Sequence, residues 1–346
     1  MHVLSAGDNF VLPELFVNAL RERAGARAEL TFSEVTFPWP QVPFGPVGTV
    51  AEATGTIDEM IEAVGNADIA VTQLAPFTKE VFDACPNLKF VGVSRGGPVN
   101  VDLEAATAAG VRVSFAPGRN AQAAAEFTIG LMLAGMRHIS DADAEMKRGT
   151  WRGDYYSHDS AGTELGGSTV GLVGYGAIGR IVARVLLAFG ADVVTYDPYA
   201  DAASIESDGV SAVSLDELID RSNVVSLHAR LSPETEHIIN AERLRRMRPG
   251  TVLVNAARGG LLDYAPLPEL LRSGHIGALA LDVYDEEPPG PEWPLFNAPN
   301  VVLSPHLAGA SRQTAERAAS IIAGEAARFI AGEPLQHLAN PDVLNR

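Results

Sequence analysis

The stretch from Thr169 to Asp197, TVGLVGYGAIGRIVARVLLAFGADVVTYD, constrains the fold more than any other part of the chain. It opens with a short apolar run typical of a strand buried on both faces, then has glycines at G-x-G-x-x-G spacing and a helical pattern. A second apolar run follows and ends on an acidic residue. Strand, turn, helix, strand and acid occur in this order within the roughly 30 residues of a βαβ unit. This order predicts a dinucleotide-binding site.

Each glycine of the motif has its own physical reason. Gly174 allows a tight turn, Gly176 lets a pyrophosphate approach the backbone, and Gly179 lets helix and strand pack closely. The N-terminus of the following helix offers free N–H groups to the phosphates. A carboxylate at Asp197 can accept hydrogen bonds from both ribose hydroxyls, which favours NAD over NADP as the cofactor.

The charge balance narrows the classes of partner. Lys and Arg number 26 against 43 Asp and Glu, which gives a formal net charge of −17. We therefore expect neither nucleic acid nor an anionic membrane as a partner, because no basic stripe is available to neutralise phosphates. An anionic substrate has to be captured by locally placed arginines against this field.

Cysteine usage and the terminal sequence bear on the compartment. Cys85 is the only cysteine, which excludes an internal disulfide and a cysteine-based metal cluster, and we predict no bound metal. The first residues, MHVLSAGDNF, lack a basic segment followed by a long apolar run, so no signal peptide is expected. The most apolar region, 121–136, is too short and polar to span a bilayer. These features predict a cytoplasmic protein.

Strand and helix patterns alternate on both sides of the glycine motif. The 346 residues suffice for two domains, and repeated strand–helix alternation predicts α/β architecture with parallel, doubly wound sheets. Residues 121–147 are alanine-rich with helical periodicity and predict one long helix or two consecutive ones. Residues 37–48 read as a loop rich in proline and glycine.

Three predicted strand ends carry side chains that could assist hydride chemistry. The protein must hold the substrate, polarise its carbonyl and move one proton. Arg258 could bind a carboxylate in bidentate fashion, His306 could act as general acid–base, and a glutamate at 286 or 287 could pair with that histidine. Taken alone, Arg258 is equally well a surface arginine and His306 a structural histidine. The glutamates at 286 and 287 are equally well part of a solvated acidic run. Their position at strand ends beside a dinucleotide site favours the catalytic interpretation.

Five ordered motifs resemble those of the D-isomer-specific 2-hydroxyacid dehydrogenase family, which includes phosphoglycerate dehydrogenases and glyoxylate/hydroxypyruvate reductases. They read GLVGYGAIGR, LHARLSPETEHIIN, VNAARGGLLD, ALDVYDEEP and LSPHLAGAS, with a weaker N-terminal match at PNLKFVGVSRGGPVNVD. The resemblance implies two Rossmann-like, doubly wound parallel-sheet domains separated by a cleft. Residues 1–118 plus 312–346 would form a discontinuous substrate domain, and residues 119–311 the NAD-binding domain. It also implies a homodimer through the alanine-rich helix; the alternative, a helix that is only buried within the chain, stays open.

The resemblance further implies roles for single residues. Arg258 would bind and polarise the substrate, and Glu287 would pair with the catalytic His306. The expected cofactor contacts are Gly174, Gly176, Ala177, Ile178, Gly179, Asp197, Ala229, Ala256, Ala257, Arg258, Asp282 and His306. The expected substrate contacts are Arg95, Gly96, Gly97 and Arg258. The implied reaction is NAD-dependent interconversion of a 2-keto acid and a D-2-hydroxy acid.

Two positions depart from the family pattern. Arg230 stands where the family commonly has proline, near the expected adenine site. In the carboxylate-binding loop, Arg95 occupies the place of a glycine, and Arg119 can approach the same region. Two arginines beside one anion site suggest a substrate with a second negative group. The alternative is that Arg95 pairs with a nearby acid and braces the loop, and both readings remain open.

Two other functions share the fold. A formate dehydrogenase is disfavoured, because formate oxidation needs no proton exchange and such enzymes lack a glutamate at the position of Glu287. A non-enzymatic NAD-sensing protein, like the C-terminal-binding corepressors, keeps the same residues. The acidic composition and the lack of an evident disordered tail disfavour it.

Overall fold

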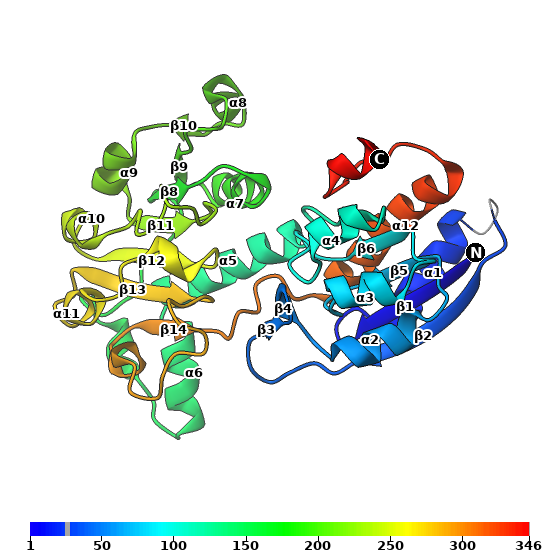
Figure 1. Cartoon of the computed structure of the whole chain (residues 1–346). Coiled ribbons are helices and arrows are strands. Elements are labelled where there is room, and N and C mark those ends of the chain that lie inside the picture. Colours follow the sequence, from blue (N-terminus) through cyan, green and yellow to red (C-terminus); the bar gives the residue numbers. More distant parts are fainter. Residues whose placement is uncertain (25–27, 346) are drawn as a thin grey trace. The chain divides into compact units, whose positions relative to one another are not determined.

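A computed structural model describes residues 1–24 and 28–345, and contacts divide the chain into two compact units. The first unit consists of Met1–Asn120 and Ala310–Arg346, and the second of Ala121–Gly309. Each has its own parallel sheet and its own core (Figure 1). The predicted α/β class with two doubly wound parallel sheets is therefore confirmed.

The second unit contains the glycine motif. Its seven described strands run parallel in the order β10-β9-β8-β11-β12-β13-β14. The strands are β8 (Thr169–Val173), β9 (Asp192–Tyr196), β10 (Ser211–Ala212), β11 (Val224–Leu227), β12 (Thr251–Asn255), β13 (Ile276–Leu281) and β14 (Val301–Leu303). The helices are α5 (Ala121–Met136), α6 (Ile139–Lys147), α7 (Ala177–Ala188), α8 (Ala202–Ser207), α9 (Leu215–Arg221), α10 (Ala241–Arg246) and α11 (Leu267–Arg272).

Alternating side chains along each strand build a core on both faces of this sheet. In β12, Val252 and Val254 pack into the core under α5 and α7, while Leu253 packs into the core under α9, α10 and α11. A strand covered on both faces needs apolar residues at successive positions. This requirement explains the apolar run VLV in the sequence.

The first unit has the same architecture with fewer strands. Its five-stranded parallel sheet, among the described residues, has the order β2-β1-β5-β6-β7. The strands are β1 (His2–Asp8), β2 (Thr31–Phe37), β5 (Ile69–Thr72), β6 (Phe90–Val93) and β7 (Arg112–Phe115). The helices are α1 (Pro13–Ala24), α2 (Ile57–Val64), α3 (Lys79–Ala84), α4 (Leu103–Ala108) and α12 (Arg312–Ala331).

The last long helix, α12, belongs to this first unit although it follows the second in sequence. Its Ile322 packs against β6 so closely that a Cβ at Gly92 would lie 2.4 Å from the Ile322 side chain. Both faces of the sheet are covered, because α2, α3 and α4 pack on one core and α1 and α12 on the other. Without the returning helix, α1 alone would cover this face of the sheet.

The structure selects between the two helical expectations for residues 121–147 and corrects the loop expected at 37–48. The alanine-rich region forms two helices, and the break falls at His138, whose φ of 55° is left-handed and cannot continue a helix. The loop at 37–48 contains β3 (Gly45–Val47), which pairs antiparallel with β4 (Val50–Ala53). This short hairpin was not predicted, and neither were α8 and β10. The strands β3, β4 and β10 are too brief for a periodic signal.

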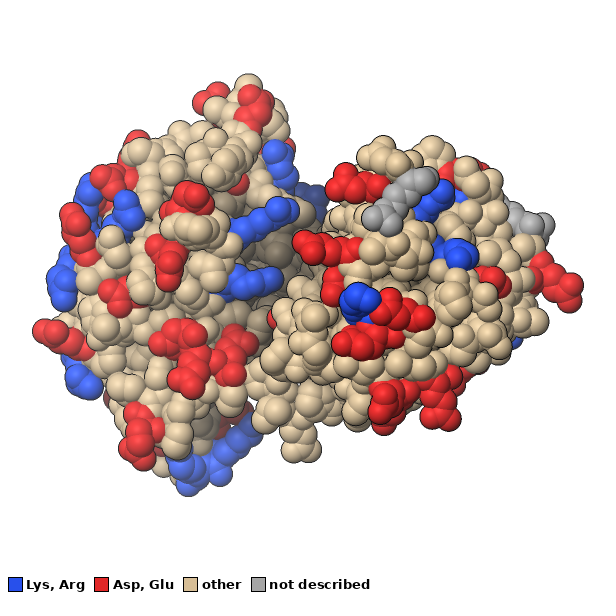
Figure 2. Space-filling model, viewed as in Figure 1, with Lys and Arg blue, Asp and Glu red and all other residues tan. Residues whose placement is uncertain are grey.

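The surface and the buried cysteine add two facts. Figure 2 shows Asp and Glu side chains spread over the visible face of each unit, and Cys85 is free and buried. Within the described residues, no helix combines the length and apolar character that a membrane span requires. In the same part of the chain, no group of three or more His, Cys, Asp or Glu side chains is arranged to hold a metal ion.

Candidate active site

The turn between β8 and α7 is shaped by its glycines. Gly174 has a φ of 106°, and a Cβ there would lie 2.7 Å from the backbone nitrogen of Ala229. A Cβ on Gly179 would lie 2.5 Å from the carbonyl oxygen of Gly174. By contrast, a Cβ built on Gly176 would meet no heavy atom within 4 Å among the described residues outside its own helix turn and chain neighbours. The turn is thus packed on its inner side and open at the glycine where a pyrophosphate should approach.

The start of α7 leaves hydrogen-bond donors free for phosphate groups. Gly176 is the N-cap, and its position bears no side chain that could satisfy the first-turn N–H groups of Ala177, Ile178 and Gly179. The first bond of the helix runs from the backbone N–H of Arg180 to the carbonyl of Gly176. This arrangement fits a bound dinucleotide, because unpaired N–H groups and the helix dipole favour a phosphate at this end.

Asp197 follows β9 and is fixed by the backbone around it. Its Oδ2 accepts a hydrogen bond from the N–H of Tyr175 at 2.7 Å, and its Oδ1 accepts one from the N–H of Tyr199 at 2.9 Å. A carboxylate oxygen has two lone pairs, so each oxygen retains capacity for a ribose hydroxyl. The donor set at the helix and the acceptor at Asp197 together suit a dinucleotide.

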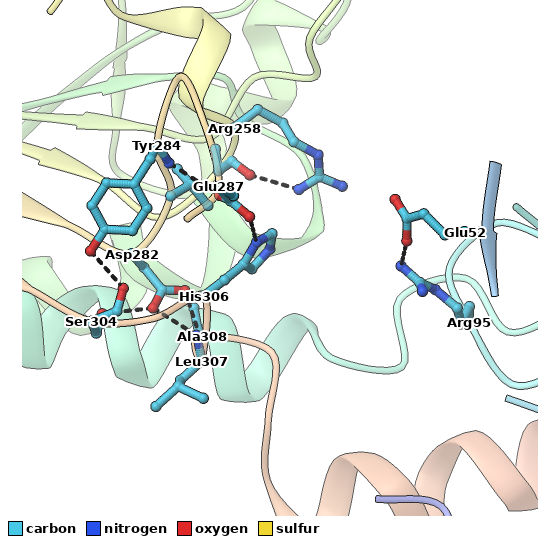
Figure 3. Close-up of polar contacts among 12 residues, drawn as sticks. Glu52, Arg95, Arg258, Asp282, Tyr284, Glu287, Ser304, His306, Leu307 and Ala308 are labelled. Atoms are coloured by element: carbon cyan, nitrogen blue, oxygen red, sulfur yellow. Dashed lines mark hydrogen bonds and ion pairs between the residues drawn. The ribbon is translucent and has the colours of Figure 1, made fainter. Parts of the chain in front are cut away.

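The side chains expected from three strand ends meet at the carboxyl edge of the same sheet (Figure 3). Arg258 follows β12, Glu287 lies in the segment after β13, and His306 follows β14. The adjacent order β12-β13-β14 is what brings these strand ends together. Glu286, the other acid considered, is exposed and lies beside the pair rather than in it.

His306 and Glu287 form a direct pair. The Nδ1 atom of His306 lies 2.8 Å from Oε2 of Glu287, and the N–H of Tyr284 donates to the other carboxylate oxygen at 3.1 Å. The hydrogen bond to Glu287 raises the pKa of His306 above its ordinary value, together with the charges of Glu287 and Asp282 and against burial. For Glu287, burial acts to raise the pKa, but the hydrogen bond and charge of His306 lower it overall.

Asp282 holds the backbone that carries His306. This fully buried carboxylate accepts hydrogen bonds from the N–H groups of Leu307 and Ala308, each at 2.7 Å, and from the hydroxyl of Ser304 at 2.6 Å. The N–H of His306 donates to the carbonyl of Asp282 at 2.9 Å. His306 itself has a left-handed φ of 54°, a conformation that persists only where surrounding contacts enforce it. Asp282 supplies those contacts.

Asn255, which was not predicted as a site residue, performs a similar task for Arg258. Its side-chain amide donates to the carbonyl of Arg258 at 2.9 Å, and its Oδ1 accepts from the N–H of Ala257 at 3.1 Å. Arg258 is exposed, and its Nη1 donates to the carbonyl of Ala257 at 2.6 Å. The available signal was a polar residue ending the buried run VLVN, because a fully buried amide needs partners nearby.

The expected carboxylate-binding loop lies in the first unit, directly after β6. Gly96 and Gly97 are open, since a Cβ at either position would meet nothing within 4 Å among the described residues compared. Arg95 forms an ion pair with Glu52 on β4, with 2.8 Å between Nη2 and Oε2 (Figure 3). Of the two readings of Arg95, pairing with a nearby acid is therefore present in the structure. Glu52 gave no recognisable signal in the sequence, because its hairpin was not predicted.

The fold and the β8–α7 turn define a dinucleotide-binding protein of the Rossmann class. The family described as D-isomer specific 2-hydroxyacid dehydrogenase, NAD binding domain, matches residues 129–308. This chain belongs to the D-isomer specific 2-hydroxyacid dehydrogenase family, and its second unit is the NAD-binding domain of that family. NAD is thus the cofactor that the turn is built to hold.

Individual relatives agree with this assignment. A D-3-phosphoglycerate dehydrogenase of Mycobacterium tuberculosis is 41% identical over 289 residues, 83% of this chain and 53% of that protein. The chain thus spans about half the length of the phosphoglycerate dehydrogenases that it matches. A glyoxylate reductase of Korarchaeum cryptofilum is 36% identical over 85% of this chain and 89% of its own length. The TT0316 protein of Thermus thermophilus has a similar structure, with a TM-score of 0.78, 33% identity and coverage of 98% of this chain and 100% of that one.

Proposed function

We propose that this chain uses NADH to reduce a 2-keto acid to the corresponding D-2-hydroxy acid, and that it can run the reverse reaction with NAD. Family membership supports the reaction class. The observation that carries the proposal is the His306–Glu287 pair at the carboxyl edge of the NAD-binding sheet. Carbonyl reduction needs a proton as well as a hydride, and a histidine held protonated by a carboxylate is suited to give it.

The side chains have distinct parts in this proposal. The bound cofactor supplies the hydride. Arg258, exposed and charged, binds the substrate carboxylate and polarises the neighbouring carbonyl. Glu287 fixes Nδ1 of His306, which leaves Nε2 as the atom that delivers the proton to the carbonyl oxygen. Asp282 and Asn255 are positioning residues, because they act through the backbone of His306 and Arg258.

Gly96 and Gly97 complete the proposal on the substrate side. Their open backbone can donate N–H groups to the substrate carboxylate, and on this basis we assign substrate binding to residues 1–118 and 312–346. The cofactor contacts of Ala229, Ala256 and Ala257 remain part of the same proposal. The acid–base pair also distinguishes this reaction from formate oxidation, in which formate gives up a hydride and no proton has to be moved.

The test is NADH oxidation by the purified chain against a panel of 2-keto acids that includes glyoxylate, hydroxypyruvate and pyruvate. We expect turnover with kcat of about 1 s⁻¹ or more on at least one of them. The product of hydroxypyruvate or pyruvate should be D-configured by chiral chromatography, whereas glycolate from glyoxylate has no stereocentre. An NAD-sensing protein without catalytic function would bind NADH and leave every keto acid unreduced. An L-configured product would contradict the proposed reaction.

We also propose a homodimer in the cytoplasm. Within the part of the chain that the structure describes, α6 buries no residue, and Ile139 and Met146 on it are more than half exposed. Trp151 and Tyr156, in the segment that follows, are 80% and 93% exposed. Large apolar side chains exposed close together are typical of an association surface. Sedimentation equilibrium should give twice the chain mass, and Trp151→Ser with Tyr156→Ser should shift the protein toward the monomer.

A further inference from the structure

Arg119 carries hydrogen-bond donors that the protein does not use. Its Nε and Nη1 atoms are buried without a hydrogen-bond partner among residues 1–24 and 28–345. The guanidinium lies over the ring of Phe10, 5.8 Å from its centroid, and the carbonyl of Arg119 accepts a hydrogen bond from Arg317 at 2.6 Å. The residue is therefore held in place by packing and backbone contacts, while no carboxylate of the described residues forms an ion pair with its guanidinium. Such a group is costly unless an anion approaches it.

Arg95 lies near enough to influence Arg119. Burial, and then the positive charge of Arg95, lower the pKa of Arg119 to about 10, so that the guanidinium of Arg119 stays charged at neutral pH. The loop of Arg95 and the segment leading to Arg119 are also joined by the backbone, since the N–H of Ala116 donates to the carbonyl of Arg95 at 2.7 Å. Two cations held close together on one sheet edge favour the binding of an anion.

Two carboxylates face these arginines, and they differ in accessibility. Asp8 at the end of β1 is 1% exposed, and its Oδ1 accepts hydrogen bonds from the N–H groups of Phe10 and Val11 at 2.8 Å. Its Oδ2 is buried and has no hydrogen-bond partner among the described residues. Burial raises the pKa of Asp8, and the charges of Arg119 and Arg95 act in the opposite direction. Asp8 is thus a fixed counter-charge that a ligand cannot displace.

Glu52 is the accessible carboxylate. Its side chain is 40% exposed and that of Arg95 is 24% exposed, so water reaches their ion pair. Ion pairs that water reaches contribute little to stability. A competing anion that bonds to two guanidinium groups at once can therefore replace Glu52, whereas Glu52 reaches Arg95 alone.

We propose that Arg95 and Arg119 form an exchangeable site for a second anionic group of the keto acid, and that Glu52 occupies Arg95 when this group is absent. The group is a carboxylate or a phosphate, since both present paired oxygens to a guanidinium. The inference rests on the proposed function and specifies its substrate class as keto acids with two anionic groups. Glu52 is then a specificity-determining residue, because its charge competes with that of the substrate.

The test compares kcat/KM within matched pairs of keto acids that differ by one anionic group. Pyruvate with oxaloacetate forms the carboxylate arm, and hydroxypyruvate with 3-phosphohydroxypyruvate forms the phosphate arm. We expect Arg95→Ala and Arg119→Gln each to lower the preference for the doubly charged member about ten- to a hundredfold, the loss of one charge-assisted contact. Glu52→Gln should raise the preference for the doubly charged keto acid, in the carboxylate arm or the phosphate arm according to which group the site binds. Glu80→Gln removes an exposed acid of the same unit and should leave the preference as it is.

The outcomes separate this inference from the proposed function. If both members of each pair fall equally in Arg95→Ala and Glu52→Gln changes neither, Arg95 only braces the loop and the second-anion site is refuted. If the native chain reduces no keto acid, the proposed function fails, and the site is tested by thermal shift with malonate or phosphate against acetate. If malonate or phosphate stabilises the native chain and Arg95→Ala abolishes this stabilisation, the result supports the site. If neither anion stabilises the native chain or the Glu52→Gln variant, the site is overturned. If Arg119→Gln fails to fold, Arg119→Lys, which retains the charge but loses the paired donors of the guanidinium, is measured in its place.

Discussion

Nδ1 of His306 lies 2.8 Å from Oε2 of Glu287, although 19 positions separate the two residues in sequence. The pair exists because β13 and β14 are neighbours in a parallel sheet, so that the segments following them meet at one edge. Its consequence is electrostatic. The carboxylate raises the pKa of the imidazole and keeps it protonated to higher pH than an isolated histidine.

This pair predicts how the pH dependence of the reductive reaction changes in Glu287→Gln. The imidazolium form of His306 is needed, so the rate should fall as pH rises through the pKa of His306. Removing the carboxylate removes the main cause that raises this pKa, and the fall should occur at lower pH. Profiles of kcat/KM against pH for the native chain and the variant provide the measurement. An unchanged midpoint would show that the pair does not set the protonation of His306.

Asp197 predicts the choice between NADH and NADPH. Its carboxylate is fixed by the N–H groups of Tyr175 and Tyr199, where it can accept ribose hydroxyls and repel a 2′-phosphate. The native chain should have a higher kcat/KM with NADH, and Asp197→Ala should narrow the gap. Asp201→Ala, at an exposed acid four residues further on, is the control. Equal kcat/KM for the two cofactors in the native chain would refute the assigned role.

Gly259 predicts a strong effect of one methyl group on the loop of Arg258. A Cβ at this position would lie 1.7 Å from the carbonyl oxygen of Tyr284, and both backbone segments would have to move. Gly259→Ala should lower the free energy of unfolding by at least about 2 kcal/mol and reduce kcat/KM. Gly290→Ala is the matched control, because a Cβ there meets nothing within 4 Å among the described residues compared. Urea denaturation of both variants measures the difference, and equal stabilities would contradict the packing described.

The sequence predicted those parts of the fold that repeat a strong local pattern. The order of β8, α7 and β9 was predicted, because apolar runs and glycines delimit these elements in the stretch from Thr169 to Asp197. The break at His138 was not predicted, since neither proline nor glycine marks it. In the site, Arg258 and His306 were found because they follow strands, but Asn255, Glu52 and Asp8 were not. Their importance depends on hydrogen bonds and charges from segments distant in sequence, which no local pattern records.

The most direct test of the account is kcat for keto acid reduction by His306→Ala, measured together with the affinity of that variant for NADH by fluorescence titration. His306 is an expected cofactor contact, but it is exposed and lies outside the β8–α7 turn that would hold the phosphates. Its removal should therefore leave most of the affinity for NADH. We expect kcat to fall about 10²–10⁴-fold, the usual loss on removing a general acid–base group. A variant that retains native kcat while binding NADH normally would contradict the assignment of His306 as the proton donor.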